Sequence, residues 1–283
     1  MNKTIRAAIK AAVPAFLLRR LRAVQHSHRF KEFYYGAKLR AIYPLLVSTG
    51  ETHNFTYDLS DTNLRYLAEM VGVATRRPPG EIEAYIQEAI DDTALRTHHD
   101  RLMQVHEGQV TAPGLRSPFG RRLGWYAVAR AMKPRVVVET GVERGHGALL
   151  LCAALLRNAA EGAPGRYYGT DINPSAGWLL AGRYAETGKI LYGDSIASLG
   201  ALGETIDLFI NDSDHSADYE AREYEVIAPR LAPGAVILGD NAHVTDRLAR
   251  FSRAHGRQFL MFDEKPKDHW YPGAGIGISF PAR

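Results

Sequence analysis

From Arg135 onward the chain alternates short apolar runs with helical segments, and this rhythm constrains its fold more than any other feature of the sequence. The apolar runs are rich in Val, Ile, Tyr and Phe, which favour strands. Strands that alternate with helices predict an α/β, Rossmann-like doubly wound sheet that is mostly parallel. The predicted strands cover residues 135–139, 166–171, 189–194, 206–212, 235–240, 258–262 and 275–280.

Acidic residues close five of these strands. They are Glu139, Asp171, Asp194, Asp212 and Asp240, and Asn241 follows the last of them. The carboxyl ends of parallel strands meet at one edge of the sheet, and ligands bind beyond that edge. Burying a charge is costly unless something pairs with it. The acids are therefore expected to face a cleft, a ligand or a metal.

The stretch "VVVETGVERGHGALLL" places Gly141 and Gly145 between the first strand and a helix. Glycine allows a tight turn and a close approach to a ligand, and the helix start offers free N–H groups. The stretch lacks both the three-glycine dinucleotide fingerprint and the Gly-Lys-Ser/Thr of a P-loop. Asp171, about thirty residues later, could accept both hydroxyls of a ribose. Asp194, which is followed by Ser195, could meet an adenine amino group.

Together these features resemble a class I S-adenosylmethionine (SAM)-dependent methyltransferase over residues 135–281. The resemblance implies a seven-stranded sheet and SAM as the cofactor. It also implies roles for individual residues in binding SAM. Glu139, Gly141 and Gly145 would lie at its methionine part, Asp171 at its ribose, and Asp194 and Ser195 near its adenine, and Asp212 would also bind the cofactor.

The motifs "NDSDH" and "GDN" further resemble those of metal-dependent O-methyltransferases of the catechol, caffeoyl-CoA and, more closely, macrolide-sugar types. The resemblance implies Asp212, Asp240 and Asn241 as ligands of a magnesium ion and His215 as the catalytic base. Oxygen ligands suit Mg²⁺, and a histidine can take a proton near neutral pH. Asp214 is an alternative to Asp212. Catechol-type enzymes use lysine as the base, so a histidine favours a sugar hydroxyl as the acceptor.

The first 130 residues look helical, and we expect three parts: a basic arm (1–45), a helical cap or oligomerisation region (46–130) and the SAM-binding domain (131–283). Residues 1–40 contain ten Lys or Arg and one Glu, so the arm carries +9 and the remaining 243 residues carry −5. Leu17, Leu21 and Val24 share a helical face, which suits a basic helix on an anionic membrane surface through residues 1–25. A solvated helix docked on its own domain is the alternative.

We therefore expect a magnesium-assisted O-methyltransferase that acts on a hydroxyl of a sugar or another small polar metabolite. A homo-oligomer is one expected form of the protein. The sequence has no transmembrane run and one cysteine, Cys152, which fits a cytoplasmic protein, and the basic arm adds a membrane-peripheral location as an alternative. An RNA methyltransferase that grips phosphates with the basic arm is a second hypothesis, but the acidic catalytic region counts against a nucleic-acid partner. A catalytically silent SAM-binding module is the third.

Overall fold

A computed structural model describes residues 14–49, 53–108, 111 and 114–282. By their contacts the residues fall into two units, which are described separately here. The first contains residues 1–50 and 268–270, and the second contains residues 51–267 and 271–283. The predicted division at residues 45 and 130 stays a prediction.

Residues 15–49 of the first unit are helical. Helix α2 (Ala15–Lys31) continues through a π-helical turn (Glu32–Gly36) into α3 (Ala37–Thr49), which contains Pro44. None of the α2 residues is buried, and apolar side chains such as Phe16, Leu21 and Val24 are more than half exposed. The start of the predicted basic arm, residues 1–13, lies outside the described residues. No helix in the described part of the chain is both long and apolar enough to span a bilayer.

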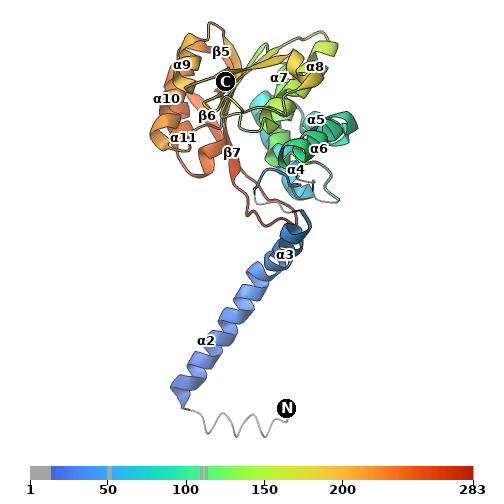
Figure 1. The fold of residues 1–283 in the computed structure, drawn as a ribbon. Helices are drawn as coiled ribbons and strands as arrows, with labels where there is room; N and C mark the ends of the chain where they lie inside the picture. The colour runs from blue at the N-terminus through green and yellow to red at the C-terminus, as the bar shows by residue number, and fades with distance from the viewer. Residues whose placement is uncertain (1–13, 50–52, 109–110, 112–113, 283) are drawn as a thin grey trace. The chain divides into compact units, whose positions relative to one another are not determined.

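The second unit is built on the predicted seven-stranded sheet (Figure 1). The strand order is β3-β2-β1-β4-β5-β7-β6, and β7 alone runs antiparallel to its neighbours. The strands are β1 (Val136–Thr140), β2 (Arg166–Asp171), β3 (Gly188–Tyr192), β4 (Ile206–Asn211), β5 (Leu231–Gly239), β6 (Arg257–Asp263) and β7 (Gly275–Pro281). Each lies within a few residues of its predicted position. The predicted fold class is confirmed.

Helices cover both faces of this sheet (Figure 1). One face carries α4 (Asp61–Thr75), α5 (Pro79–Asp91), α6 (Thr93–Glu107), α7 (Leu123–Met132) and α8 (His146–Ala160). The other face carries α9 (Ser195–Ala201), α10 (Ala217–Ile227) and α11 (Arg247–Ala254). Residues of one strand alternate between the two cores: Leu208 and Ile210 of β4 pack with the first group, and Phe209 with the second.

Strand order reverses between β1 and β4, because the chain adds β2 and β3 on one side of β1 before it returns to the other side. Both strands are parallel and paired from Val137↔Leu208 to Thr140↔Asn211, so their acidic ends emerge side by side. The crevice outside such a reversal point is where open α/β sheets bind ligands. The fold therefore places Glu139 and Asp212 at the expected position for a ligand site.

Candidate active site

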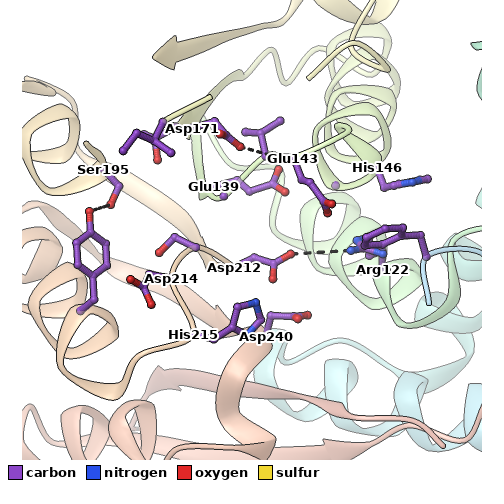
Figure 2. A pocket seen from close by; sticks show the side chains of 18 of the residues that line it. Arg122, Glu139, Glu143, His146, Asp171, Ser195, Asp212, Asp214, His215 and Asp240 are labelled. Atoms are coloured by element: carbon purple, nitrogen blue, oxygen red, sulfur yellow. Dashed lines mark hydrogen bonds and ion pairs between the residues drawn. The ribbon is translucent and has the colours of Figure 1, made fainter. Parts of the chain in front are cut away.

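A cavity of about 790 Å³ opens at the carboxyl ends of the strands. Its volume falls within the range of small-molecule sites. Figure 2 shows Ser195 and Asp214 on one side of the view, with Arg122 and His146 on the other. The predicted site residues that line the cavity are Glu139, Gly141, Asp171, Asp194, Ser195, Asp212, His215 and Asp240. Gly145 and Asn241 lie outside the lining.

The glycine loop depends on the absence of side chains. Gly141 has φ +78°, and a Cβ built there would lie 2.1 Å from the carbonyl oxygen of Asp212. Gly145 has φ +96° and precedes α8 without a capping side chain. The loop can therefore pass close to β4, and no side chain among the described residues caps the start of α8.

Glu139, on β1, is almost completely buried at the floor of the cavity. The Tyr167 hydroxyl donates a hydrogen bond of 2.6 Å to its carboxylate. Burial raises the pKa of Glu139 to about 8, although this hydrogen bond acts in the opposite direction. A cationic group of a ligand near Glu139 would favour the charged carboxylate.

Asp171 and Asp194 form the more open side of the rim. The two oxygens of Asp171 accept hydrogen bonds from the backbone amides of Glu143 and Asn173, both at 2.8 Å. Asp194 caps α9 through the amide of Ala197 at 2.8 Å and accepts the Tyr219 hydroxyl at 2.7 Å. The Tyr219 hydrogen bond, together with the backbone ones, lowers the pKa of Asp194. Carboxylate oxygens have two lone pairs each, so both groups can still accept hydroxyl donors from a ligand.

Glu223, on α10, joins several strand and helix ends beneath this side of the cavity. It accepts hydrogen bonds from Thr140 at 3.1 Å and Ser213 at 2.8 Å, and also from Ser195 and Asn211. The Ser195 hydroxyl, predicted to contact the cofactor, is thus already bound to Glu223. Sequence analysis missed Glu223 because it lies in mid-helix, and only the folded chain brings its partners together.

Asp212 and Asp214 differ in their surroundings. The Asp212 side chain is 14% exposed and lies beside Asp240, whereas Asp214 is exposed and accepts the backbone amide of Ser216. Burial, followed by the charge of Asp240, raises the pKa of Asp212 well above its usual range. Asp212 is thus the residue of the two that lies beside Asp240 in the cavity wall.

Asp240 is paired with Arg121, which sequence analysis did not single out. The Nε and Nη2 atoms of Arg121 each donate to a different Asp240 oxygen at 2.6 Å. Its Nη1 atom contacts the Tyr57 hydroxyl at 2.8 Å and Glu264 at 3.3 Å. Burial alone would raise the pKa of Asp240, but the charge and hydrogen bonds of Arg121 outweigh it and lower the pKa to about 2. The Tyr57 hydroxyl also donates to Glu264 at 2.6 Å. Arg121, Asp240, Tyr57 and Glu264 thus form one buried, connected network.

The residues predicted to hold magnesium do not fit that ion as they are arranged. Both oxygens of Asp240 are bound by Arg121, and Arg122 lies 3.9 Å from Asp212. Asn241 is fully buried outside the cavity lining. Within the described ranges, His, Cys, Asp and Glu form no cluster of three or more that could hold a metal. Two guanidinium groups occupy the position where the resemblance implied a cation.

Two histidines lie in the cavity wall. His215, the predicted base, is exposed to the cavity in the loop between β4 and α10. His146, at the start of α8, is buried, and burial lowers its pKa well below the usual range. The His146 Nδ1 atom lies 3.3 Å from Nε2 of His99, whose Nδ1 lies 2.9 Å from Asp100. The lowered pKa keeps His146 neutral and makes it a weaker base than an ordinary histidine.

Comparison with known proteins gives one family match. Residues 138–242 match the family model described as a methyltransferase domain. No curated protein sequence matches the chain significantly.

Solved structures similar to the chain include three bacterial methyltransferases. A methyltransferase from Geobacter sulfurreducens is 14% identical, with a TM-score of 0.47 over 68% of this chain and 92% of that one. The O-methyltransferase TomG from Streptomyces achromogenes, in complex with SAM, is 16% identical, with a TM-score of 0.45 over 68% of this chain and 91% of that one. An O-methyltransferase from Bacillus cereus is 14% identical, with a TM-score of 0.41 over 76% of this chain and 97% of that one.

The family match covers the glycine loop and every predicted acidic strand end, from β1 to the start of the turn after β5. The sheet order and the antiparallel β7 agree with the expected fold. Residues 138–242 thus form a methyltransferase domain, and the sheet that contains them has the fold expected of a class I SAM-dependent methyltransferase.

Proposed function

We propose that the protein transfers the methyl group of SAM to a hydroxyl of a sugar or another small polar metabolite. The observation that carries the proposal is that His215 lines the same cavity as Asp171 and Asp194, the predicted cofactor residues. A hydroxyl bound beside His215 would therefore lie in one enclosed space with the methyl donor. Holding two reactants in this way lowers the entropic part of the barrier.

In the proposed reaction the acceptor oxygen attacks the methyl carbon of SAM. The carbon–sulfur bond breaks, its electron pair goes to sulfur, and S-adenosylhomocysteine (SAH) leaves. His215 takes the hydroxyl proton as the new carbon–oxygen bond forms. Magnesium assistance is not part of this scheme, because Arg121 already gives Asp240 a positive partner, and its charge would repel a metal ion at the same carboxylate.

The test is methyl transfer from labelled SAM to a panel of sugar and natural-product hydroxyls, followed by kinetics with the best acceptor. The variant His215→Ala should lower kcat by about 10²- to 10⁴-fold, the usual contribution of a general base, with unchanged SAH affinity. His146→Gln is the matched control. A loss confined to His146→Gln would move the base to His146, and SAH binding without turnover of any acceptor would favour the silent module.

We also propose that the basic helix of the first unit contacts an anionic membrane surface. Helix α2 carries Arg19, Arg20, Arg22, Arg29 and Lys31 beside its exposed apolar side chains. Each such charge near an anionic bilayer contributes about 1 kcal/mol. Deletion of residues 1–25 should abolish co-sedimentation with phosphatidylserine vesicles, and neutral phosphatidylcholine vesicles are the control. Unchanged sedimentation would contradict this proposal.

RNA is the other surface that this helix could meet. RNA binding through phosphate contacts would weaken steeply with salt. A filter assay that shows salt-sensitive RNA binding by the full chain, lost on the same deletion, would favour the RNA methyltransferase hypothesis over the membrane.

A further inference from the structure

Two consecutive arginines, Arg121 and Arg122, line the cavity but differ in their hydrogen-bond partners. Arg121 is saturated, with Asp240, Glu264 and Tyr57 as partners. The neighbouring Arg122 side chain is 7% exposed and also lines the cavity. Its Nη2 atom lies 3.9 Å from Asp212, an ion-pair contact too long for a hydrogen bond (Figure 2).

The remaining nitrogens of Arg122, Nε and Nη1, are buried and have no hydrogen-bond partner among the described residues. A buried donor without a partner is destabilising, and more so when it is charged. The guanidinium is held over aromatic rings instead, 5.4 Å from the Trp125 centroid and 6.0 Å from that of Phe55. The two rings therefore hold the Arg122 guanidinium in place, but two of its nitrogens lack a hydrogen-bond acceptor among the described residues.

A second arginine shows that this state is specific to Arg122. Arg144 lies over the same Phe55 ring, 4.4 Å from its centroid, and is also largely buried. Its guanidinium is paired with Glu107 and with Glu143. Arg144 is also absent from the cavity lining. Of these two arginines on one ring, only Arg122 faces the cavity and lacks a close acceptor.

We propose that Arg122 binds an anionic oxygen group, a carboxylate or a phosphate, of a ligand in this cavity. Arginine suits such groups because its planar donors match their oxygens. The inference rests on the proposed function for its ligands, and the anion has two sources there. It is either the methionine carboxylate of the cofactor or an acidic group on the acceptor, next to the hydroxyl to be methylated.

The test uses calorimetry on the full chain with two nucleosides that differ by the anion. SAH carries the carboxylate and 5′-methylthioadenosine lacks it. If the cofactor is the source, Arg122→Gln should weaken SAH binding by about tenfold or more, with unchanged methylthioadenosine binding. Arg122→Lys should recover part of the loss, and Arg144→Gln, the control on the same ring, should change neither.

If the acceptor is the source, SAH binding should not change in Arg122→Gln. Inorganic phosphate titrated into the SAH complex should then bind the wild type and Arg144→Gln in a saturable way and lose that binding in Arg122→Gln. Equal affinities of wild type and Arg122→Gln for SAH and for phosphate, with a folded variant by circular dichroism, would overturn the proposal. Failure of SAH to bind the wild type would sink the proposed function alone, because phosphate titration of the unliganded proteins still tests Arg122.

Discussion

The two sides of the cavity rim treat their carboxylates in opposite ways. Asp171 and Asp194, after β2 and β3, receive backbone amides and a tyrosine hydroxyl and lie open to the cavity. Asp212 and Asp240, after β4 and β5, are buried and face arginines. The same residue type at the same strand position is thus an open acceptor at Asp171 and half of a close ion pair at Asp240.

The difference shows that an acidic strand end does not by itself indicate a metal. An open carboxylate held by neutral donors keeps lone pairs for ligand hydroxyls. A buried carboxylate needs a positive partner, which can be a metal or a guanidinium. Here the chain supplies that charge itself through Arg121, from a turn in front of α7.

Among the variants that test this comparison, the largest expected effect is a loss of stability. Asp240→Asn leaves Arg121 buried with only Glu264 as its counter-charge, so we expect the free energy of unfolding to fall by about 3–5 kcal/mol. Urea unfolding in buffer with EDTA measures it, with Asp214→Asn, on an exposed carboxylate, as the control. A variant as stable as the wild type in EDTA would mean that Asp240 has no structural partner.

Glu139 lies between the two sides and gives a pH test. Its pKa rises from about 4.5 in the unfolded chain to about 8 in the fold, so its contribution to stability is complete below the first value. That contribution is lost as the pH rises through the second value, by up to about 1.4 kcal/mol per pH unit. Glu139→Gln should therefore gain stability relative to the wild type between about pH 5 and pH 8. If the free energies of unfolding of the wild type and Glu139→Gln differed by a constant amount across that pH range, the raised pKa of Glu139 would be refuted.

On the open side, the expected effect is on cofactor affinity. Asp171→Ala removes the predicted ribose acceptor, and a hydrogen bond to a charged group contributes about 1.5–3 kcal/mol. SAH binding should weaken by roughly 10- to 100-fold in calorimetry. Asp214→Ala should bind SAH like the wild type. Equal affinity of Asp171→Ala and wild type would remove the ribose assignment.

The smallest effect concerns the support of Asp194. Tyr219→Phe deletes the hydroxyl that donates to Asp194 and so raises the pKa of that carboxyl toward its ordinary value. We expect a loss in SAH affinity of about 1 kcal/mol, or several-fold, with no change in fold. A loss as large as that of Asp171→Ala would show that Tyr219 itself contacts the cofactor.

The sheet and the acidic rim were predictable because they rest on local signals. β-Branched and aromatic runs mark the strands, and an acid that ends a parallel strand must reach the ligand edge. The glycine loop was predictable for the same reason. β5 begins at Leu231, earlier than predicted, because Pro233 and Gly234 hide its first residues from a propensity pattern.

The arginines were not predictable. Arg121 and Asp240 are 119 residues apart, and in the sequence "GRRLGWYAVARAM" the two arginines look like the start of an ordinary helix. Only the fold reveals that the turn Gly120–Arg122 aims both of them at the ends of β4 and β5. A resemblance based on acids alone therefore implied a cation without showing which one is present.

The most direct test of this central claim is a crystal structure of the wild type grown with SAH and Mn²⁺, measured for anomalous scattering of manganese. We predict SAH in the cavity, the Arg121–Asp240 pair intact, and no anomalous peak between Asp212 and Asp240. A manganese peak bound by these carboxylates, with Arg121 displaced, would contradict the account and restore the metal-assisted mechanism.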